Sequence, residues 1–308
     1  KGIDLTAIMN PGAPGGLPVD TGVKLKLDAV RQRPHIDEEI MEEIRPAIMT
    51  HGHVVVRRTI RNTDRSIGTR LSGELAFLYG EGHYHGNIQY QLRGAAGQSF
   101  GAFLTAGIEL RLRGVANDYV GKGMSGGIIS IRMPKRIRAR KKSHTVIGNV
   151  VLYGATGGKL LVAGRGGERF AVRNSGAAAV VEGVGNHCCE YMTRGTVIVL
   201  GEFGRNFGAG MTGGVAFVYR ASAEKLENLN RDFVRTASFS MADEGLVRRL
   251  LRSHKFHTGS VTADLILNNW EDKRSHFVKV VPLALDIIDF EEVYDQHIAA
   301  RMGVLLNE

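Results

Sequence analysis

A glycine-led repeat with a period close to 20 residues is the feature that most constrains how this chain can fold. Seven times between positions 86 and 219, a glycine precedes four to seven residues typical of a β-strand. The leading residues are Gly86, Gly107, Gly127, Gly158, Gly176, Gly195 and Gly214. The one long gap, of 31 residues, contains a basic insertion, and removing about 12 residues there restores a spacing of 19.

One β-run per period of about 20 residues is typical of a solenoid. A leucine-rich repeat would need leucines at fixed steps and an Asn or Cys at each bend, and the chain has neither pattern. Short aliphatic runs such as Ile128, Ile129 and Ile131, with glycines where the chain turns, favour a parallel β-helix instead. Its turns would stack about 4.8 Å apart and fold as a unit. An ordinary β-sandwich with 8–12-residue strand spacing is the alternative.

Composition divides the chain into three parts, at 1–60, 61–220 and 221–308. The first part holds a proline- and glycine-rich arm at 1–22, an acidic helix at 37–49 with Ile40, Ile44 and Ile48 on one face, and a strand at 53–60. The second part is the β-helix. The third is a helical extension, with helices expected at 222–233, 242–254, 260–277 and 289–303. We expect these helices to cover the open last turn of the solenoid.

The net charge of +9 is concentrated in one segment. Seven basic residues without an acid lie at Arg132, Lys135, Arg136, Arg138, Arg140, Lys141 and Lys142. The rest of the chain therefore carries a net charge of only about +2. The segment is either a solvated loop or a docking patch for an acidic partner surface. Nucleic acid is the least favoured partner, because no aromatic side chains alternate with these charges.

Apolar runs and cysteines indicate in which cellular compartment the chain is expected. No apolar run reaches 18 residues and no charged-then-apolar pattern stands at the start, so we expect neither a membrane span nor a secretory leader. Cys188 and Cys189 are the only cysteines, and they form no Cys-x-x-Cys motif for zinc or an iron–sulfur cluster. We expect two reduced thiols in the cytoplasm.

Three polar groups could hold a site, and a structural role is favoured for each. They are Asn117 with Asp118 and Tyr119; Glu168 with Arg169 and Arg173; and His83, His85 and His187 with Cys188 and Cys189. The first should form a corner whose side chains bond the turn backbone, and the second should form ion pairs along one face. The third should be a surface loop and a buried thiol pair rather than a metal site. We expect no catalytic, cofactor-binding or metal-binding residue.

Longer motifs carry a further likeness. They include GVANDYVGKGMSGG at 114–127 and GRNFGAGMTGGVAFV at 204–218, and further runs at 94–104, 148–158 and 167–201, with flanking runs at 60–75, 254–260 and 269–282. Spread over about three-quarters of the chain, they resemble the C-terminal GXGXG domain of the glutamate synthase large subunit. The resemblance implies a mainly β fold, a right-handed parallel β-helix of about seven turns with short helical segments at both ends.

The resemblance also implies a role. Glutamate synthase joins a glutaminase, which uses an N-terminal cysteine, to a synthase with FMN and an iron–sulfur cluster. This chain begins with Lys1 and lacks the cluster cysteines. We therefore expect a non-catalytic part that holds the catalytic domains in register for ammonia transfer. Its expected partners are glutaminase (amidotransferase) and FMN-synthase domains or subunits, with an NAD(P)H-oxidising subunit or ferredoxin as electron donor.

Departures from the family pattern leave alternatives open. The segment at 82–86, the basic run and the sequence after Pro282 differ from the family, which is consistent with a divergent member, a separate β-helix subunit or an excised domain. A free-standing scaffold, related to the β-helix subunit of formylmethanofuran dehydrogenase, is one alternative. An independent β-helix enzyme is another. It is disfavoured because the acids Glu109, Asp118, Glu168, Glu182 and Glu190 do not recur at the repeat spacing.

Overall fold

The computed structural model describes residues 34–134, 144–219 and 223–284. The chain divides into two units, Lys1–Pro34 and His35–Glu308, and nearly all described residues belong to the second. The arm at 1–22 and the last expected helix, at 289–303, lie outside the described residues. None of the described helices combines the length and the apolar character needed to cross a bilayer.

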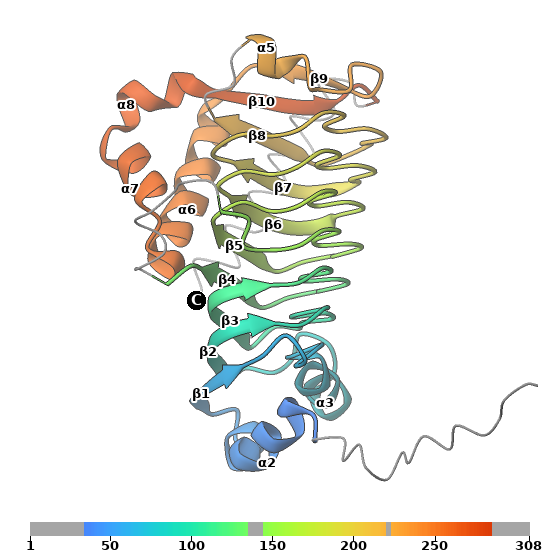
Figure 1. Cartoon of the computed structure of the whole chain (residues 1–308), viewed down its shortest axis with the longest axis vertical. Helices are drawn as coiled ribbons and strands as arrows, with labels where there is room; N and C mark the ends of the chain where they lie inside the picture. Colours follow the sequence, from blue (N-terminus) through green and yellow to red (C-terminus); the bar gives the residue numbers. More distant parts are fainter. Residues whose placement is uncertain (1–33, 135–143, 220–222, 285–308) are drawn as a thin grey trace, which may run out of the picture. The chain divides into compact units, whose positions relative to one another are not determined.

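Ten strands form a single sheet in the order β1-β2-β3-β4-β5-β6-β7-β8-β10-β9 (Figure 1). Their bounds are β1 His53–Ile60, β2 Asn87–Ala96, β3 Ile108–Ala116, β4 Ile128–Arg132, β5 Lys159–Ala163, β6 Ser175–Val181, β7 Arg194–Val199, β8 Val215–Tyr219, β9 Val234–Ala237 and β10 Phe277–Pro282. Strands β1 to β8 pair in parallel in chain order, whereas β10 is antiparallel to both β8 and β9. The mainly β prediction is borne out in part, because the described residues form one ten-stranded mixed sheet together with several helices. We call β1–β8 and their connections the parallel stack.

The repeat predicted seven strands for the stack, and the described residues contain eight. The additional strand, β1, was predicted as a strand but was placed outside the repeat. It pairs with β2 over its whole length, from His53 opposite Asn87 to Ile60 opposite Gly94. Gly52 directly precedes β1, as Gly86 precedes β2 and Gly107 precedes β3, but it stands 34 residues before Gly86. The broken period hid this strand because helix α3, Thr69–Tyr79, is inserted between β1 and β2.

Inward-facing side chains of the stack are aligned in columns by the parallel register. One column consists of Val56, Tyr90, Leu110, Ile129, Leu160, Ala179, Val197 and Ala216. Every member is at most 1% exposed. Because each turn places an apolar side chain directly above that of the previous turn, the interior is a continuous apolar core.

The connections between strands repeat an unusual backbone conformation. From the β2–β3 connection to the β7–β8 connection, each has three residues with positive φ at alternate positions, for example Arg169, Ala171 and Arg173. The Arg169 N–H donates to Asn186 O in the following turn at 2.9 Å, and the Ala171 N–H donates to Val151 O in the preceding turn at 2.9 Å. These bonds hold the left-handed residues in place from both sides.

The expectation that glycines make the corners is therefore only partly right. Non-glycine residues such as Val150, Leu152 and Tyr191 also occupy left-handed positions. A left-handed conformation costs an L-residue about 1–2 kcal/mol, so the inter-turn hydrogen bonds have to offset it. Glycine is required where turns approach closely: at Gly127 a Cβ atom would lie 2.6 Å from Ile108 O.

Two helices cover the first strand of the stack. Helix α2, Ile36–Met49, buries Ile40, Ile44 and Ile48, and these side chains belong to the same core cluster as Val56 of β1. The helix and its apolar face were predicted correctly. Helix α3 packs beside α2 at this end (Figure 1) and was not predicted as a helix. Its Gly73, in the middle of the segment, weakens the helical pattern in the sequence.

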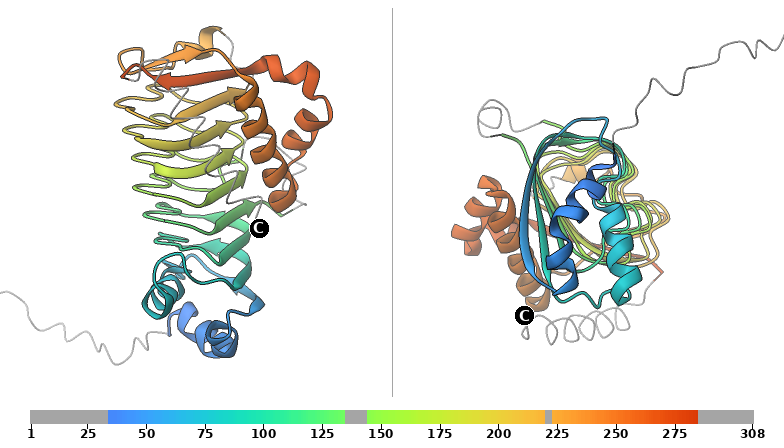
Figure 2. Two further views of the ribbon diagram at one scale, coloured as in Figure 1. Left: turned by 180° about the vertical axis from the view of Figure 1, so that it is seen from behind. Right: turned by 90° about the horizontal axis from the view of Figure 1, so that it is seen from below.

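The opposite edge of the stack is covered by strands. Strand β10 pairs with the otherwise open edge of β8, and β9 pairs with β10. Helices α6, Met241–Thr258; α7, Val261–Asn268; and α8, Trp270–Lys273 instead lie along the side of the sheet (Figures 1 and 2). The expectation that helices cover the last turn is wrong, because β10 occupies the open edge of β8 and supplies the hydrogen-bond partners of its backbone groups.

Of the helices predicted in this region, one is present as expected and two are shortened or interrupted. The helix predicted at 242–254 is confirmed by α6. At 222–233 only the short helix α5, Ala223–Leu226, is present, and the chain then turns into β9. The predicted helix at 260–277 is interrupted at Asn269, which caps α7, and it ends in the 3₁₀ helix η2, Arg274–His276, before Phe277 begins β10.

A buried ion pair joins α6 to the closing strand. Lys279 Nζ of β10 lies 3.0 Å from Asp243 Oδ2, and the two side chains are 2% and 0% exposed. The same carboxylate oxygen accepts hydrogen bonds from the N–H and the hydroxyl of Ser240, the N-cap of α6, at 2.8 and 2.9 Å. The start of α6 is thus tied to the strand that covers the edge of the stack.

The left-handed conformation of Val150, at φ 57°, can be tested by substitution. Asparagine tolerates this conformation better than a β-branched residue, so Val150→Asn should stabilise the protein by about 1 kcal/mol in urea unfolding. The matched control is Val151→Asn, which places the same amide in the core, where Val151 is 0% exposed, and should destabilise. Loss of stability in Val150→Asn would contradict the claim that this position is strained.

The buried ion pair gives a second test. Lys279→Met leaves the Asp243 carboxylate buried without its cation and should lower the free energy of unfolding by about 3–5 kcal/mol. The control is Lys255→Met, which removes the exposed pair with Asp264 (2.5 Å, side chains 47% and 41% exposed) and should cost less than about 1 kcal/mol. Equal losses in the free energy of unfolding in the two variants would show that the Asp243–Lys279 pair does not stabilise the junction between α6 and β10.

Candidate interaction surface

Only one of the seven residues predicted as a docking patch lies in the described part of the chain. Arg132 is the last residue of β4, is half-buried, and donates from Nη1 to Thr258 O, at the end of α6, at 3.3 Å. Lys135, Arg136, Arg138, Arg140, Lys141 and Lys142 lie outside the described residues. Arg132 therefore places the start of the basic segment at the side of the sheet that also carries α6.

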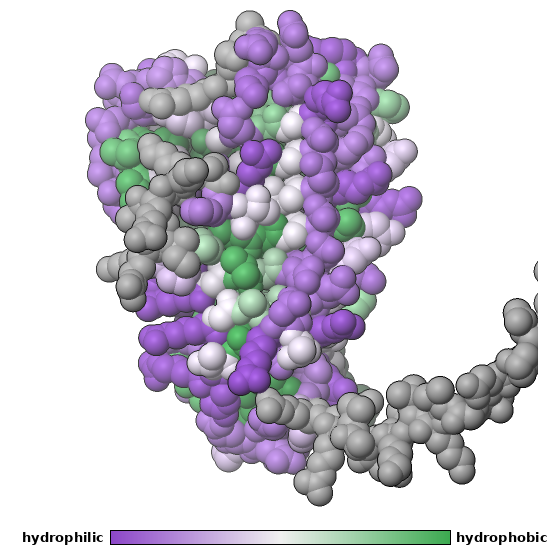
Figure 3. All heavy atoms as spheres, viewed as in Figure 1, coloured by the Kyte–Doolittle hydropathy of each residue, from purple (hydrophilic) through white to green (hydrophobic). Residues whose placement is uncertain are grey.

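The outward face of the sheet has two different halves. In β5–β8 the outward positions hold Leu161, Val180, Ile198 and Phe217, which form a second apolar core with side chains of α6, α7 and α8. The aligned positions in β1–β4 are Arg57, Gln91, Arg111 and Ser130. The helices thus cover the apolar half. On the side of the molecule seen in Figure 3, hydrophilic residues predominate and apolar ones gather in a band along the stack.

Five outward-facing arginines on β1–β4 make up what we call the arginine face. They are Arg57, Arg93, Arg111, Arg113 and Arg132. Arg93, Arg113 and Arg132 are aligned directly across β2, β3 and β4 by the parallel register. Arg93 and Arg113 are exposed. Side chains in such a row come within about 5 Å of one another at their Cβ atoms, so like charges there repel.

Sequence reasoning identified Arg132 but missed the other four arginines. A signal was present in the runs IQYQLRG at 88–94 and IELRLRG at 108–114, where polar residues alternate with buried apolar ones. This period of two places Arg93, Arg111 and Arg113 on one face. The alignment of the strands with one another, which turns separate residues into a surface, depends on the register of the stack.

A buried carboxylate marks the boundary between the two halves. Glu109 of β3 is 6% exposed and accepts hydrogen bonds from Arg111 Nε at 2.5 Å and Gln89 Nε2 at 2.8 Å. His257 Nδ1, from the last turn of α6, lies 2.8 Å from Glu109 Oε1, the same oxygen that accepts from Arg111 Nε. Burial alone would raise the pKa of Glu109, but the hydrogen bonds from His257, Arg111 and Gln89 outweigh it and lower the pKa to about 2.

The predicted corner at Asn117 and Asp118 is confirmed and is part of a longer series. Asp118 Oδ1 accepts from the Asn149 N–H at 2.7 Å, and Asn149 Oδ1 accepts from the Glu168 N–H at 2.8 Å. In the next turns Glu168 Oε2 accepts from the Asn186 N–H, and Asn186 Oδ1 accepts from the Arg205 N–H, each at 2.8 Å. We call this series the corner ladder. Its polar atoms bind the backbone of the following turn, which gives it a structural role.

The other two polar groups are separated by the fold. The ion-pair prediction is right for Arg169, whose Nη1 lies 2.7 Å from Glu190 Oε2, and wrong for Glu168, which belongs to the corner ladder. Arg173 lies over the rings of Tyr153 and Tyr191 at about 6 Å.

The histidines and cysteines do not form one cluster. The His85 N–H, just before β2, donates to His51 Nδ1 at 3.1 Å. His187 belongs to the stack instead, where its Nδ1 lies 2.9 Å from Asn206 Nδ2. Cys188 and Cys189 are buried with their Sγ atoms 3.7 Å apart, and burial raises the pKa of Cys188 well above its usual range. Within residues 34–134, 144–219 and 223–284, no group of three His, Cys, Asp or Glu side chains is arranged to hold a metal ion.

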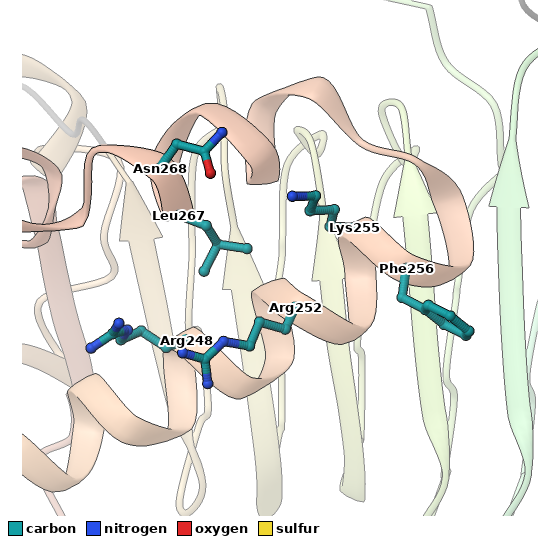
Figure 4. Close-up of a pocket in the computed structure, with 6 residues that line it drawn as sticks. All are labelled: Arg248, Arg252, Lys255, Phe256, Leu267 and Asn268. Atoms are coloured by element: carbon teal, nitrogen blue, oxygen red, sulfur yellow. The ribbon is translucent and has the colours of Figure 1, made fainter.

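A cleft of about 390 Å³ between α6 and α7 is a further candidate site. It is lined by Arg248, Arg252, Lys255, Phe256, Leu267 and Asn268 (Figure 4). Two of its three cations are already paired, Arg248 with Glu244 at 3.4 Å and Lys255 with Asp264 at 2.5 Å. The first pair joins two residues of α6, and the second joins α6 to α7. The cleft is therefore explained by the packing of these two helices.

Comparison with known proteins identifies the family. A family model described as the GXGXG motif matches residues 37–283, most of the chain. The chain belongs to the GXGXG family. Its relatives include a ferredoxin-dependent glutamate synthase of Antithamnion sp., 43% identical over 263 residues and 84% of this chain, and ferredoxin-dependent glutamate synthase 2 of Synechocystis, 46% identical over 252 residues and 81% of this chain. A glutamate synthase [NADH] of Schizosaccharomyces pombe is 42% identical over 292 residues and 92% of this chain.

These relatives are much longer proteins. The matched region is 17% of the Antithamnion protein, 16% of the Synechocystis protein and 13% of the Schizosaccharomyces pombe protein. The GXGXG family and the glutamate synthase likeness agree with the resemblance drawn from the motifs. The similarity extends over the parallel stack and its covering elements, from α2 to β10.

The low pKa of Glu109 predicts how its contribution to stability changes with pH. A carboxyl with a pKa lowered from 4.5 to about 2 stabilises the fold above about pH 4.5, and this contribution is lost as the pH falls toward 2. Urea unfolding of the wild type and Glu109→Gln should therefore differ most at neutral pH and converge in acid. Glu81→Gln, at an exposed position before β2, is the control and should show no such convergence. A constant difference down to pH 2 would contradict the assignment.

Proposed function

We propose that this chain is a non-catalytic, right-handed parallel β-helix that holds the catalytic parts of a glutamate synthase-type complex in register. Eight parallel strands would enclose about seven complete turns. The observation that carries the proposal is the match to the GXGXG family over 37–283, together with the similarity of more than four-fifths of the chain to glutamate synthases. That similarity comprises the whole stack rather than a single motif, so the feature shared with these proteins is the scaffold itself.

The physical character of the stack supports a spacer role. Its interior is filled by large side chains with 0% exposure, such as Tyr90, Phe100 and Phe170, so the described part can act on other molecules mainly through its outer surface. Each connection is hydrogen-bonded to the turns before and after it, which makes the stack stiff along its length. A stiff body with long side faces is suited to keeping other domains at a fixed separation.

The cofactors and partners belong to the proposal. FMN and an iron–sulfur cluster would be held by partner domains or subunits, together with a glutaminase (amidotransferase). An NAD(P)H-oxidising subunit or a ferredoxin would supply electrons. Ammonia released by the glutaminase would be used by the synthase part while this chain maintains their relative position. A cytoplasmic location is part of the same proposal.

Purification of the chain alone and with its expected partners tests this function. Alone, it should show neither flavin absorbance nor glutaminase activity. Co-expressed with the amidotransferase and FMN-synthase polypeptides of the same organism, it should co-elute with them. Removing this chain from the assembly should then lower glutamine-dependent glutamate formation more than glutaminase activity. Flavin bound to the isolated chain, or an assembly that forms and couples both activities without it, would contradict the proposal.

A further inference from the structure

One position in the connections of the parallel stack is occupied either by glycine or by a large exposed side chain. It is the third left-handed position of each connection. In chain order from the β2–β3 connection, it holds Phe103, Gly123, Gly154, Arg173, Tyr191 and Gly210. Glycine adopts this conformation without steric cost, whereas an L-residue is strained in it. Phe103, Arg173 and Tyr191 therefore strain the fold where the equivalent turns use glycine, which points to a use for these side chains outside folding.

The three side chains belong to a row that we call the aromatic ridge. Five consecutive connections contribute to it, and its members are Phe103, Tyr119, Lys122, Tyr153, Arg173 and Tyr191. Because consecutive turns stack about 4.8 Å apart, the ridge is about 19 Å long. Phe103, Tyr119 and Tyr191 are 55%, 37% and 54% exposed. Helix α6 packs on strands β4, β5 and β6, and the connections protrude on the other side of the stack (Figures 1 and 2).

The side chains of the ridge are held in place by the neighbouring turns. The Phe103 ring lies against the backbone of the next turn, where a Cβ atom on Gly123 would be 2.7 Å from Phe103 Cε1. The Tyr191 ring lies in the same way against a glycine of the turn that follows it. The Arg173 guanidinium is about 6 Å from the rings of Tyr153 and Tyr191, in the turns before and after its own. Binding would therefore cost these side chains little conformational entropy.

The ridge also carries two positive charges. Within the described residues, Arg173 and Lys122 form no ion pair. Arg173 Nη1 donates to Tyr153 Oη at 3.4 Å, and Lys122 Nζ lies 5.8 Å from the centre of the Tyr119 ring. Aromatic residues and arginine are enriched at protein interfaces, and tyrosine and arginine are frequent among the residues that dominate binding. The ridge is thus complementary to a protein surface that has an acidic side chain among apolar ones.

We propose that the aromatic ridge binds one of the catalytic parts of the complex, with an acidic side chain of that partner against Arg173 and apolar side chains against Phe103 and Tyr191. The inference rests on the proposed function, which supplies a protein partner for the stack. It adds which face of the stack is used and what kind of surface fits that face. Side chains that strain the isolated chain would then stabilise the assembly.

Replacing the three strained residues by the glycine of the equivalent turns separates binding from folding. F103G/R173G/Y191G should unfold at a urea concentration no lower than that of the wild type, because glycine relieves the strain. Its affinity for the amidotransferase and FMN-synthase polypeptides of the same organism should fall at least a hundredfold. The matched control, R252A/F256A/L265A, removes an arginine and two large apolar side chains from exposed positions of α6 and α7 and should bind like the wild type.

A single substitution tests the acidic contact. R173E should weaken binding at least tenfold without changing the urea unfolding curve, and added salt should weaken binding of the wild type more than that of R173E. Equal salt dependence in the two proteins would overturn the acidic contact.

The outcomes also separate this inference from the proposed function. If the wild type binds the catalytic polypeptides and F103G/R173G/Y191G binds them equally well, the ridge proposal is overturned and the proposed function stands. If the wild type does not bind them, the proposed function fails. A urea midpoint of the glycine variant below that of the wild type would contradict the strain from which the argument starts. A dimer of the isolated chain that the glycine variant cannot form would make a second copy the occupant and would also overturn the proposal.

Discussion

Every turn of the parallel stack has to hydrogen-bond to the turn before it and the turn after it. In the connections, the N–H groups of successive left-handed residues alternate between these two directions, as those of Arg169 and Ala171 do. This requirement keeps equivalent positions in register from β1 to β8 and leaves one open edge at each end. Helices α2 and α3 cover the first strand, and β10 pairs with the last. The match to the GXGXG family spans both coverings, so the stack and its ends form one unit.

The same requirement accounts for the left-handed residues of the connections. Val150, Leu152 and Tyr191 would not adopt positive φ in an isolated peptide at low cost. They do so here because the inter-turn bonds and the corner ladder satisfy the backbone of each turn in that conformation only. Strain is thus repeated at equivalent positions rather than concentrated at one site. This regular distribution identifies the strain as a property of the scaffold, and it agrees with a structural rather than a catalytic role for the corner residues.

The outward face of the sheet shows how one scaffold serves two purposes. Where the outward residues are apolar, helices α6, α7 and α8 cover them, and the second core adds stability. Where they are arginines, the described elements leave the face uncovered. Glu109, held by Arg111 from the sheet and His257 from α6, lies at the boundary. The choice of residue at alternate strand positions therefore decides which part of the face is packed against helices and which part keeps exposed charged side chains.

The sequence by itself determined the repeat, the strands that follow its glycines, the apolar face of α2, the corner at Asp118 and the family. Each of these depends on residues close in the chain or on a periodic pattern. Only the tertiary structure decided that β1 joins the stack across a 34-residue interval, that β10 rather than a helix covers β8, and that Arg93, Arg113 and Arg132 form one row. Those outcomes depend on which edge is open and on how distant strands align. Such pairing is set by backbone groups that every residue shares, so the side chains alone do not specify it.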